Sequence, residues 1–295
     1  MNVETKRAKA ERLRELHRRE SILVLPNAWD PLSARAFESC GFPAVATTSA
    51  GIAYSFGYPD GERLGRGEMA EATTRIVGAV SVPITADVEA GYGPSPEDAA
   101  ETAQAVVGAG AVGLNLEDAA DASPPGQEGS PGEGAAGPLV ELAAQVEKIR
   151  AMVAAGEETG VPLVVNARTD TYWRSVGDDP GRRFSETVRR GNAFLEAGAD
   201  CVFVPGVKDP ETILGLAREL SGPLNVLVGP GVPPIPNLAD LGVRRVSVGS
   251  GPARAVMGLV RRIGQELLEG GTYASLSEGA VAYDEANRLF SEGGR

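Results

Sequence analysis

The sequence is short of the two side chains that most often carry acid–base catalysis or bind transition metals. It has one histidine, His17, and two cysteines, Cys40 and Cys201, in 295 residues. His17 stands among four arginines in a charged N-terminal stretch, so we expect it on a solvated helix face. A Ser-His-Asp triad, a histidine-ligated zinc and a histidine base are therefore poor candidates. Any chemistry must use carboxylates, arginine, tyrosine, backbone amides or a hard metal ion.

The two cysteines are far apart and form no Cys-x-x-Cys pair. This usage fits a reducing compartment and argues against a thiolate metal site. We expect Cys40 at the end of a helix and Cys201 inside a strand, both as buried small hydrophobic residues rather than catalytic thiols.

Long apolar runs are also absent, and no stretch reaches the roughly 18 to 20 residues of a membrane helix. The first twenty residues are charged and helix-periodic, without the apolar segment of a secretory signal, so the cytoplasm is the expected location. The net charge of −12 would repel phosphate backbones and anionic lipid surfaces. Neither nucleic acid nor a membrane is therefore predicted as a partner.

Eight short apolar runs recur along the chain and predict parallel strands that are buried on both faces. They span residues 22–25, 44–49, 83–88, 113–118, 162–169, 200–205, 223–228 and 244–249.

Helical patterns fill the intervals between these runs, at residues 31–40, 66–80, 96–108, 139–159, 182–197, 210–220 and 252–268. Eight β-then-α units in about 250 residues predict the α/β class and a single (β/α)8 TIM barrel. We assign residues 1–295 to one domain with a core at about 20–268. A helix at about 4–19 would cap the base of the barrel, and residues 269–295 would add a C-terminal helical extension.

One segment breaks this regular composition. Residues Ser123–Gly137 contain five glycines and three prolines in fifteen residues. The segment follows the fourth predicted strand, on the rim where barrel active sites form. We expect it to be a lid that closes over bound substrate.

Acidic residues gather at the predicted carboxyl ends of neighbouring strands, which point at a common centre in a barrel. They are Asp60, Asp87, Glu89 and Glu117. Such an excess of negative charge is destabilising unless it is compensated. With no histidine or thiolate nearby, Mg2+ or Mn2+ is the expected occupant. The alternative is that some of these acids lie on surface loops or pair with Arg168.

Arg168 ends the next predicted strand and is placed to grip a substrate carboxylate with two hydrogen bonds. Its alternative role is a structural salt bridge to Asp170 or Glu117. Asn225 ends the seventh predicted strand and is a further polar candidate for contacting the substrate.

Five segments in order resemble the isocitrate lyase/phosphoenolpyruvate mutase superfamily. They are residues 25–35 (LPNAWDPLSAR), 57–60 (GYPD), 86–93 (ADVEAGYG), 116–118 (LED) and 166–170 (NARTD), within a match that spans about residues 20–255. The resemblance implies a Mg2+-dependent barrel that binds a 2-oxo or 2-hydroxy carboxylate and makes or breaks a C–C or P–C bond beside it.

The resemblance also implies roles for single residues. Asp87 would bind the metal directly, while Asp60, Glu89 and Glu117 would surround the waters of the metal. Arg168, Glu117 and Asp60 would take part in catalysis. Arg168 would hold or polarise the substrate, and its carboxylate would meet the backbone near Thr47, Ser49, Ala50 and Gly51. Family members further suggest a homo-oligomer, a tetramer with C-terminal helices exchanged between paired subunits.

The chain departs from the family pattern in two places. The Lys-x-Cys-Gly-His signature of members that cleave isocitrate or methylisocitrate is absent, and Ser123–Gly137 holds no Lys, Cys, His or Asn in its place. Glu89 stands where the family usually has Asp, a difference of one methylene that a residue acting through water can absorb.

These observations predict a lyase or mutase-like enzyme whose metal ion and Arg168 stabilise an enolate or enolpyruvate. Two alternatives remain open. One is a phosphate-binding barrel enzyme, because Gly229-Pro230-Gly231 and Gly249-Ser250-Gly251 follow strands seven and eight, where many barrels bind phosphate. The other is a non-catalytic oxo-acid-binding barrel that has lost its acid/base group.

Overall fold

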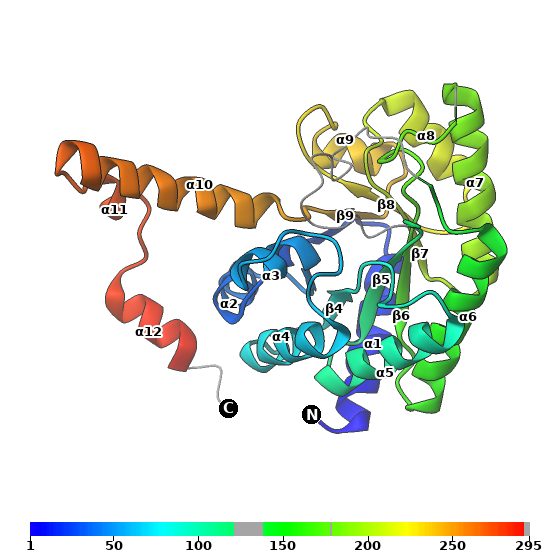
Figure 1. The fold of residues 1–295 in the computed structure, drawn as a ribbon, viewed down its shortest axis with the longest axis horizontal. Coiled ribbons are helices and arrows are strands. Elements are labelled where there is room, and N and C mark those ends of the chain that lie inside the picture. Colours follow the sequence, from blue (N-terminus) through cyan, green and yellow to red (C-terminus); the bar gives the residue numbers. More distant parts are fainter. Residues whose placement is uncertain (121–137, 178, 292–295) are drawn as a thin grey trace.

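Parallel strands form the centre of the molecule, with helices arranged around them (Figure 1). The computed structural model describes residues 1–120, 138–177 and 179–291. Its nine strands pair in the order β1-β9-β8-β7-β6-β5-β4-β3-β2. They are β1 (Leu23–Leu25), β2 (Asn27–Ala28), β3 (Val45–Thr47), β4 (Ile84–Asp87), β5 (Gly113–Glu117), β6 (Val164–Arg168), β7 (Cys201–Val204), β8 (Leu224–Leu227) and β9 (Arg245–Ser247).

The nine strands occupy the eight positions of a barrel, because β1 and β2 are two halves of one strand interrupted at Pro26. Proline has no N–H to donate to a ladder. β1 pairs with β9, β2 pairs with β3, and the N–H of Ala46 donates to the Pro26 carbonyl across the gap (2.9 Å). The predicted (β/α)8 barrel is confirmed, and all eight predicted strands are found; the interruption of the first was not predicted.

Every predicted helix is also found. The helices are α1 (Val3–Arg18), α2 (Pro31–Ser39), α3 (Ser49–Ser55), α4 (Arg66–Ala79), α5 (Pro96–Ala109), α6 (Leu142–Glu158), α7 (Pro180–Glu196), α8 (Pro210–Glu219), α9 (Ile235–Asp240), α10 (Gly251–Gln265), α11 (Ala274–Ser277) and α12 (Tyr283–Ser291), with a π-helical turn η1 (Glu266–Gly270) after α10. Helices α3 and α9 were not predicted, since both are short and carry no clear apolar stripe. No described helix has the length and apolar character needed to cross a membrane.

Helix α1 covers the base of the barrel, as predicted. Arg14 of α1 donates to the carboxylate of Asp200, which directly precedes β7. It also donates to the backbone carbonyls of Pro162 and Leu163, which precede β6. The prediction for His17 was wrong, because His17 is buried. It lies on the same helix stripe as Ala10 and Leu13, and this spacing outweighs its charged neighbours.

His17 meets a buried arginine inside the barrel. Arg245 of β9 is fully buried and donates to His17 Nε2 (3.3 Å) and to Asn115 Oδ1 (3.2 Å). Because arginine only donates, His17 Nε2 must accept, and His17 Nδ1–H donates to the Leu13 carbonyl (2.8 Å). Burial, together with the charge of Arg245, lowers the pKa of His17 to about 3.

This pKa predicts a specific acid sensitivity. Below pH 6.5, His17 becomes protonated in the unfolded chain, whereas in the folded chain it stays neutral until about pH 3. Stability present above pH 6.5 should therefore be lost as the pH falls toward 3, by up to about 1.4 kcal/mol per pH unit relative to His17→Gln. Denaturant unfolding of both proteins at several pH values measures this difference. A histidine ring that titrates near pH 6.5 by NMR in the folded protein would contradict the assignment.

The two cysteines differ in exposure. Cys201 is buried in β7, as predicted, and burial raises the pKa of its thiol to about 12. Cys40 follows the end of α2 but is exposed, so the prediction of a buried side chain there was wrong. The residue caps the helix where the chain turns toward solvent.

We therefore expect a thiol reagent to modify Cys40 in the folded protein and Cys201 only after unfolding. Cys201→Ala should lower the free energy of unfolding by about 1–2 kcal/mol, whereas Cys40→Ala should change it little. Mass spectrometry after labelling and denaturant unfolding provide the two measurements. Rapid labelling of Cys201 in the native protein would show that β7 is not closed as described.

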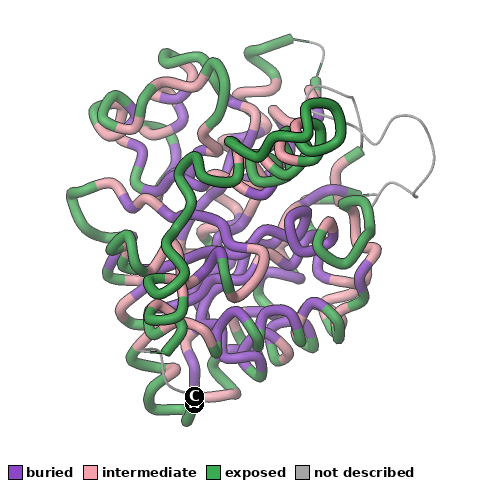
Figure 2. The backbone as a smooth tube through the Cα atoms, turned by 90° about the vertical axis from the view of Figure 1, so that its left-hand side faces the viewer, coloured by how far each residue is buried: buried purple, intermediate pink, exposed green. Residues whose placement is uncertain are grey.

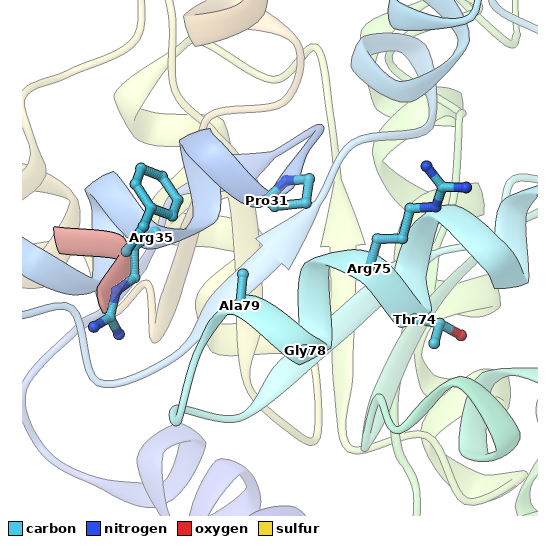
Figure 3. Close-up of a pocket in the computed structure, with 7 residues that line it drawn as sticks. Pro31, Arg35, Thr74, Arg75, Gly78 and Ala79 are labelled. Carbon is cyan, nitrogen blue, oxygen red and sulfur yellow. The ribbon is translucent and has the colours of Figure 1, made fainter. Parts of the chain in front are cut away.

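The C-terminal helices leave the barrel as an arm (Figure 1). α10 buries only Ala253 among its described residues, and most of the arm is exposed (Figure 2). α12 returns to the barrel wall, where the Leu289 carbonyl accepts a hydrogen bond from Arg35 Nε (2.6 Å). Phe290 lines a cavity of about 700 Å3 with residues of α2 and α4 (Figure 3). None of the predicted site residues lines this cavity.

Candidate active site

Three charged residues end adjacent strands of the barrel. Asp87 ends β4, Glu117 ends β5 and Arg168 ends β6. Glu117 and Arg168 stand opposite each other in the β5–β6 register. Glu89 lies two residues beyond β4, and Asp60 lies in the segment between α3 and α4. The fold thus brings the four predicted acids and Arg168 to one rim.

Asp87 is held by the β3–α3 junction. Its backbone N–H donates to Thr47 Oγ1 (2.8 Å), and its Oδ2 accepts hydrogen bonds from the N–H (3.0 Å) and the hydroxyl (2.8 Å) of Ser49. None of the hydrogen bonds among the described residues is donated to Asp87 Oδ1. Residues 47 and 49 therefore fix the orientation of Asp87 and leave one carboxylate oxygen available.

Glu89 is buried and has a left-handed backbone, with φ +50°. Its Oε2 accepts the N–H of Glu62 (2.5 Å), and its carbonyl accepts the N–H of Glu117 (2.9 Å). The second contact ties the Glu89 backbone to the end of β5. Glu89 and Glu117 are thus positioned by the same hydrogen bond.

Arg168 lies in an ion-paired chain. Its Nη1 contacts Glu117 Oε2 (2.6 Å), while Nε and Nη2 bind the two oxygens of Asp170 (2.6 and 3.0 Å). The salt bridges to Asp170 and Glu117 that were the alternative role of Arg168 are therefore present. A guanidinium has five N–H groups, so two remain for another ligand. A two-point grip on a substrate remains a prediction.

Asp170 has its own support, which the sequence analysis did not assign. Its N–H donates to Asp118 Oδ1 (2.8 Å), and Asp118 Oδ2 binds Arg190 of α7 (3.1 Å). Asp118 is fully buried, and this burial, together with the charge of Asp170, raises its pKa to about 6. The pair of adjacent acids Glu117-Asp118 was the sequence signal for this support. Glu117 lies at the rim, and Asp118 binds the backbone of Asp170.

Burial and neighbouring negative charges raise the pKa values of three acids at the rim, Asp60, Glu89 and Glu117. Burial, and then the charges of Asp60 and Asp87, raise the pKa of Glu89 to about 8. Burial also raises the pKa of Glu117 well above its usual value, although Arg168 opposes this. Asp60 is exposed, yet partial desolvation at the crowded rim and repulsion from Asp87 raise its pKa. The site therefore carries more acid than its protein cations balance.

The donor set fits a hard divalent cation. Carboxylate oxygens are the ligands that Mg2+ and Mn2+ prefer, and Mg2+ keeps several waters while binding one or two carboxylates. Among the described residues no three acidic, histidine or cysteine side chains are grouped closely enough to enclose a metal directly. A cation bound at this rim would therefore have fewer than three of these side chains as direct ligands, and water would complete its coordination.

The other predicted substrate contacts lie at two places. Ala50 and Gly51 form the buried first turn of α3, and the N–H of Gly51 already donates to Thr48 Oγ1 (3.3 Å). A Cβ at Gly51 would stand 2.8 Å from Trp29 Cβ, so only glycine fits. Asn225 is fully buried in β8 and exchanges hydrogen bonds with Ser247 (3.1 and 3.3 Å). Its predicted contact with substrate is not tested by these contacts.

The predicted lid, Ser123–Gly137, lies outside the described residues. The residues on either side of it meet next to Glu117. Ala119 and Leu139 form an antiparallel bridge, and the N–H of Val140 donates to the Asp118 carbonyl (2.8 Å). The chain therefore leaves the rim and returns to it at the same point.

Comparisons with known proteins give the class of this barrel. The family model of phosphoenolpyruvate phosphomutase matches residues 13–268. The chain belongs to this family, and the predicted superfamily resemblance is confirmed.

Individual relatives agree. The chain is 34% identical over 281 residues to an uncharacterised protein of Mycobacterium tuberculosis, covering 92% of this chain and 96% of that one. It is 28% identical to an oxaloacetate decarboxylase of Paraburkholderia xenovorans, covering 96% and 94%.

Two solved structures are similar throughout. A protein of Burkholderia cenocepacia J2315, assigned as a lyase or mutase, has 35% identity and a TM-score of 0.85, covering 98% of this chain and 97% of that one. A phosphonopyruvate hydrolase, in complex with oxalate and Mg2+, has 25% identity and a TM-score of 0.79, covering 96% and 95%.

The geometry predicts unequal roles for two of the acids. Asp87→Ala should abolish binding of Mg2+, because it removes the carboxylate with an available oxygen. Glu89→Asp should keep much of the affinity, because a residue acting through water tolerates a shift of one methylene. Titration calorimetry with Mg2+ measures both affinities. Equal affinity in Asp87→Ala and the parent protein would mean that the cation binds elsewhere.

Proposed function

We propose that the protein is a Mg2+-dependent lyase or mutase-like enzyme that makes or breaks a C–C or P–C bond next to a 2-oxo or 2-hydroxy carboxylate. The observation that carries the proposal is the convergence of Asp60, Asp87, Glu89 and Glu117 on one rim beside Arg168. Burial and the neighbouring negative charges raise the pKa values of three of these acids, Asp60, Glu89 and Glu117. A site built for a neutral ligand has no need for this excess of charge.

The position of each acid at the rim suggests its role in binding the metal. Asp87 would hold the metal, because Thr47 and Ser49 fix its carboxylate with one oxygen available. Glu89, Glu117 and Asp60 would orient the waters of the metal. When bound, the cation would supply positive charge next to the oxygen on which negative charge develops.

Arg168 would act on the substrate with its two remaining N–H groups. Asp170 holds its guanidinium plane with two hydrogen bonds, so its charge is fixed in place before substrate arrives. A preorganised cation of this kind stabilises a developing oxyanion, such as that of an enolate, more than a mobile one does.

The proposed substrate class rests on the names of two relatives and on the chemical group that their named compounds share. Oxaloacetate and phosphonopyruvate, which occur in the names of two relatives, are both 2-oxo carboxylates. The bond that is cleaved or formed stays open between C–C and P–C, because Ser123–Gly137 has neither family signature.

Turnover tests this proposal directly. Metal-stripped protein should be inactive toward a panel of oxaloacetate, 2-methylisocitrate, other 2-oxo and 2-hydroxy diacids and phosphonopyruvate, and Mg2+ should restore activity with at least one of them. Arg168→Lys should then lower kcat more than it changes Mg2+ affinity. Binding of oxo acids without turnover of any would favour a non-catalytic oxo-acid-binding barrel instead.

A phosphate-binding barrel is the second candidate. The loops after β8 and β9 line a cavity of about 190 Å3 together with Lys208 and Arg254. Inorganic phosphate that binds there without Mg2+, and that is lost in Arg254→Met, would favour this function. Phosphate binding that needs Mg2+ and Asp87 would favour the first proposal.

We also propose that the protein forms a homo-oligomer through its C-terminal arm. Val256, Met257 and Val260 on α10 are 45–61% exposed, and Leu268 of η1 is 86% exposed. A contiguous apolar helix face of this kind marks an interaction surface. A second copy of the chain that exchanges its arm would cover it, as the family resemblance suggests.

Light scattering tests the oligomer. The parent protein should have the mass of a dimer or tetramer, and Val260→Glu combined with Leu268→Glu should reduce this mass. Val3→Glu, which places the same charge at an exposed valine of α1, serves as the control and should leave the mass unchanged. A monomeric parent protein would contradict the proposal.

A further inference from the structure

The loop that carries Glu89 has an unusual backbone. Four of the five residues in Glu89–Gly93, the Glu89 loop, have left-handed φ angles: Glu89 (+50°), Gly91 (+96°), Tyr92 (+57°) and Gly93 (+155°). Glu89 and Tyr92 are not glycines, so this conformation persists only where surrounding structure enforces it. One backbone hydrogen bond joins the loop to the residue before it, from Gly91 N–H to the Val88 carbonyl (2.9 Å).

Lys148 of α6 supplies much of the enforcement. Its side chain is buried, and its ammonium donates to the Ala90 carbonyl (2.5 Å) and to the Gly93 carbonyl (3.0 Å). One charged group thus joins both ends of the turn that follows Glu89. The methylenes of Lys148 also pack under the loop, since a Cβ at Gly91 would stand 3.7 Å from Lys148 Cε.

The two carbonyls between these ends are also bound by side chains of helices. Thr102 Oγ1 of α5 donates to the Gly91 carbonyl (2.8 Å), and Arg66 Nη2 of α4 donates to the Tyr92 carbonyl (3.3 Å). Four consecutive carbonyls are therefore bound by three neighbouring helices. Lys148 is the one of these donors that binds two of them.

We propose that Lys148 is a positioning residue for the Glu89 carboxylate, holding the Glu89 loop in the conformation that presents this carboxylate to the divalent cation. The inference rests on the metal site of the proposed function and adds to it a group that does not touch the metal. Lys148 can act on Glu89 through the adjoining backbone, because its ammonium binds the carbonyl of Ala90, which directly follows Glu89.

If Lys148 acted only through its positive charge, its removal would change the metal affinity in the opposite direction. As a bare positive charge near Glu62, Asp98 and Glu117, it would repel a cation, and its removal would strengthen metal binding. If Lys148 is a clamp that holds the Glu89 loop, its removal frees the loop and weakens metal binding. The sign of the change in affinity separates the two roles.

The experiment compares Lys148→Met with Lys6→Met, using Mn2+ binding followed by electron paramagnetic resonance on the full chain. Lys6 is a matched control, because its ammonium also donates to a backbone carbonyl, that of Val107 in α5. We expect Lys148→Met to weaken Mn2+ binding about threefold to tenfold, less than Asp87→Ala, because Lys148 supports a carboxylate that acts through the waters of the metal. Lys6→Met should leave it unchanged.

A double-mutant cycle links the effect to Glu89. In a Glu89→Gln background, Lys148→Met should cost little further affinity, because the carboxylate that it positions is already gone. Thr102→Val should act in the same direction as Lys148→Met but by a smaller factor. Tighter Mn2+ binding in Lys148→Met, or an equal loss with and without Glu89, would overturn the proposal.

Hydrogen exchange without metal keeps the test independent of the proposed function. Peptides that cover residues 89–93 should exchange faster in Lys148→Met than in Lys6→Met. Unchanged exchange there overturns the clamp even if metal binding falls. If the parent protein binds no Mn2+, the proposed metal site fails, and with it the role for Glu89, whatever the exchange shows.

Discussion

The crowding of carboxylates at one partly buried rim is the constraint on which the rest of the site depends. Asp60, Asp87, Glu89 and Glu117 bring negative charges close together there. Burial, and then the charges of Asp60 and Asp87, raise the pKa of Glu89 to about 8. Such an arrangement costs free energy in folding. The barrel tolerates it because many backbone and side-chain donors around the rim hold these acids in place.

The supporting contacts form layers behind the rim. Thr47 and Ser49 hold Asp87 from the neighbouring strand, and Asp118 and Arg190 hold Asp170, which in turn fixes Arg168. These residues come from different βα units and meet only because parallel strands end at the same edge. The barrel thus converts distant sequence positions into one rigid arrangement of charge.

The strands, the helices and the gathering of acids could be predicted because each leaves a local mark in the sequence. Apolar runs mark buried strands, and acids directly after such runs mark the rim. The interruption at Pro26 and the exposure of Cys40 depend on how distant segments pair and could not be read locally. The burial of His17 was not predicted, because its charged neighbours obscured the apolar stripe on its helix. Nothing in the pattern around Lys148 indicated that its ammonium is buried against a loop 55 to 58 residues earlier.

If the acidic rim binds Mg2+ as proposed, we expect the cation to displace protons from these carboxyl groups. Calorimetric titration of Mg2+ at pH 7 in two buffers of different ionisation enthalpy measures this exchange directly. The pKa of Glu89, about 8, predicts that Mg2+ binding releases protons and that the observed heat depends on the buffer. Binding of Mg2+ with the same heat in both buffers would show that the acids are already ionised and would contradict a protonated rim.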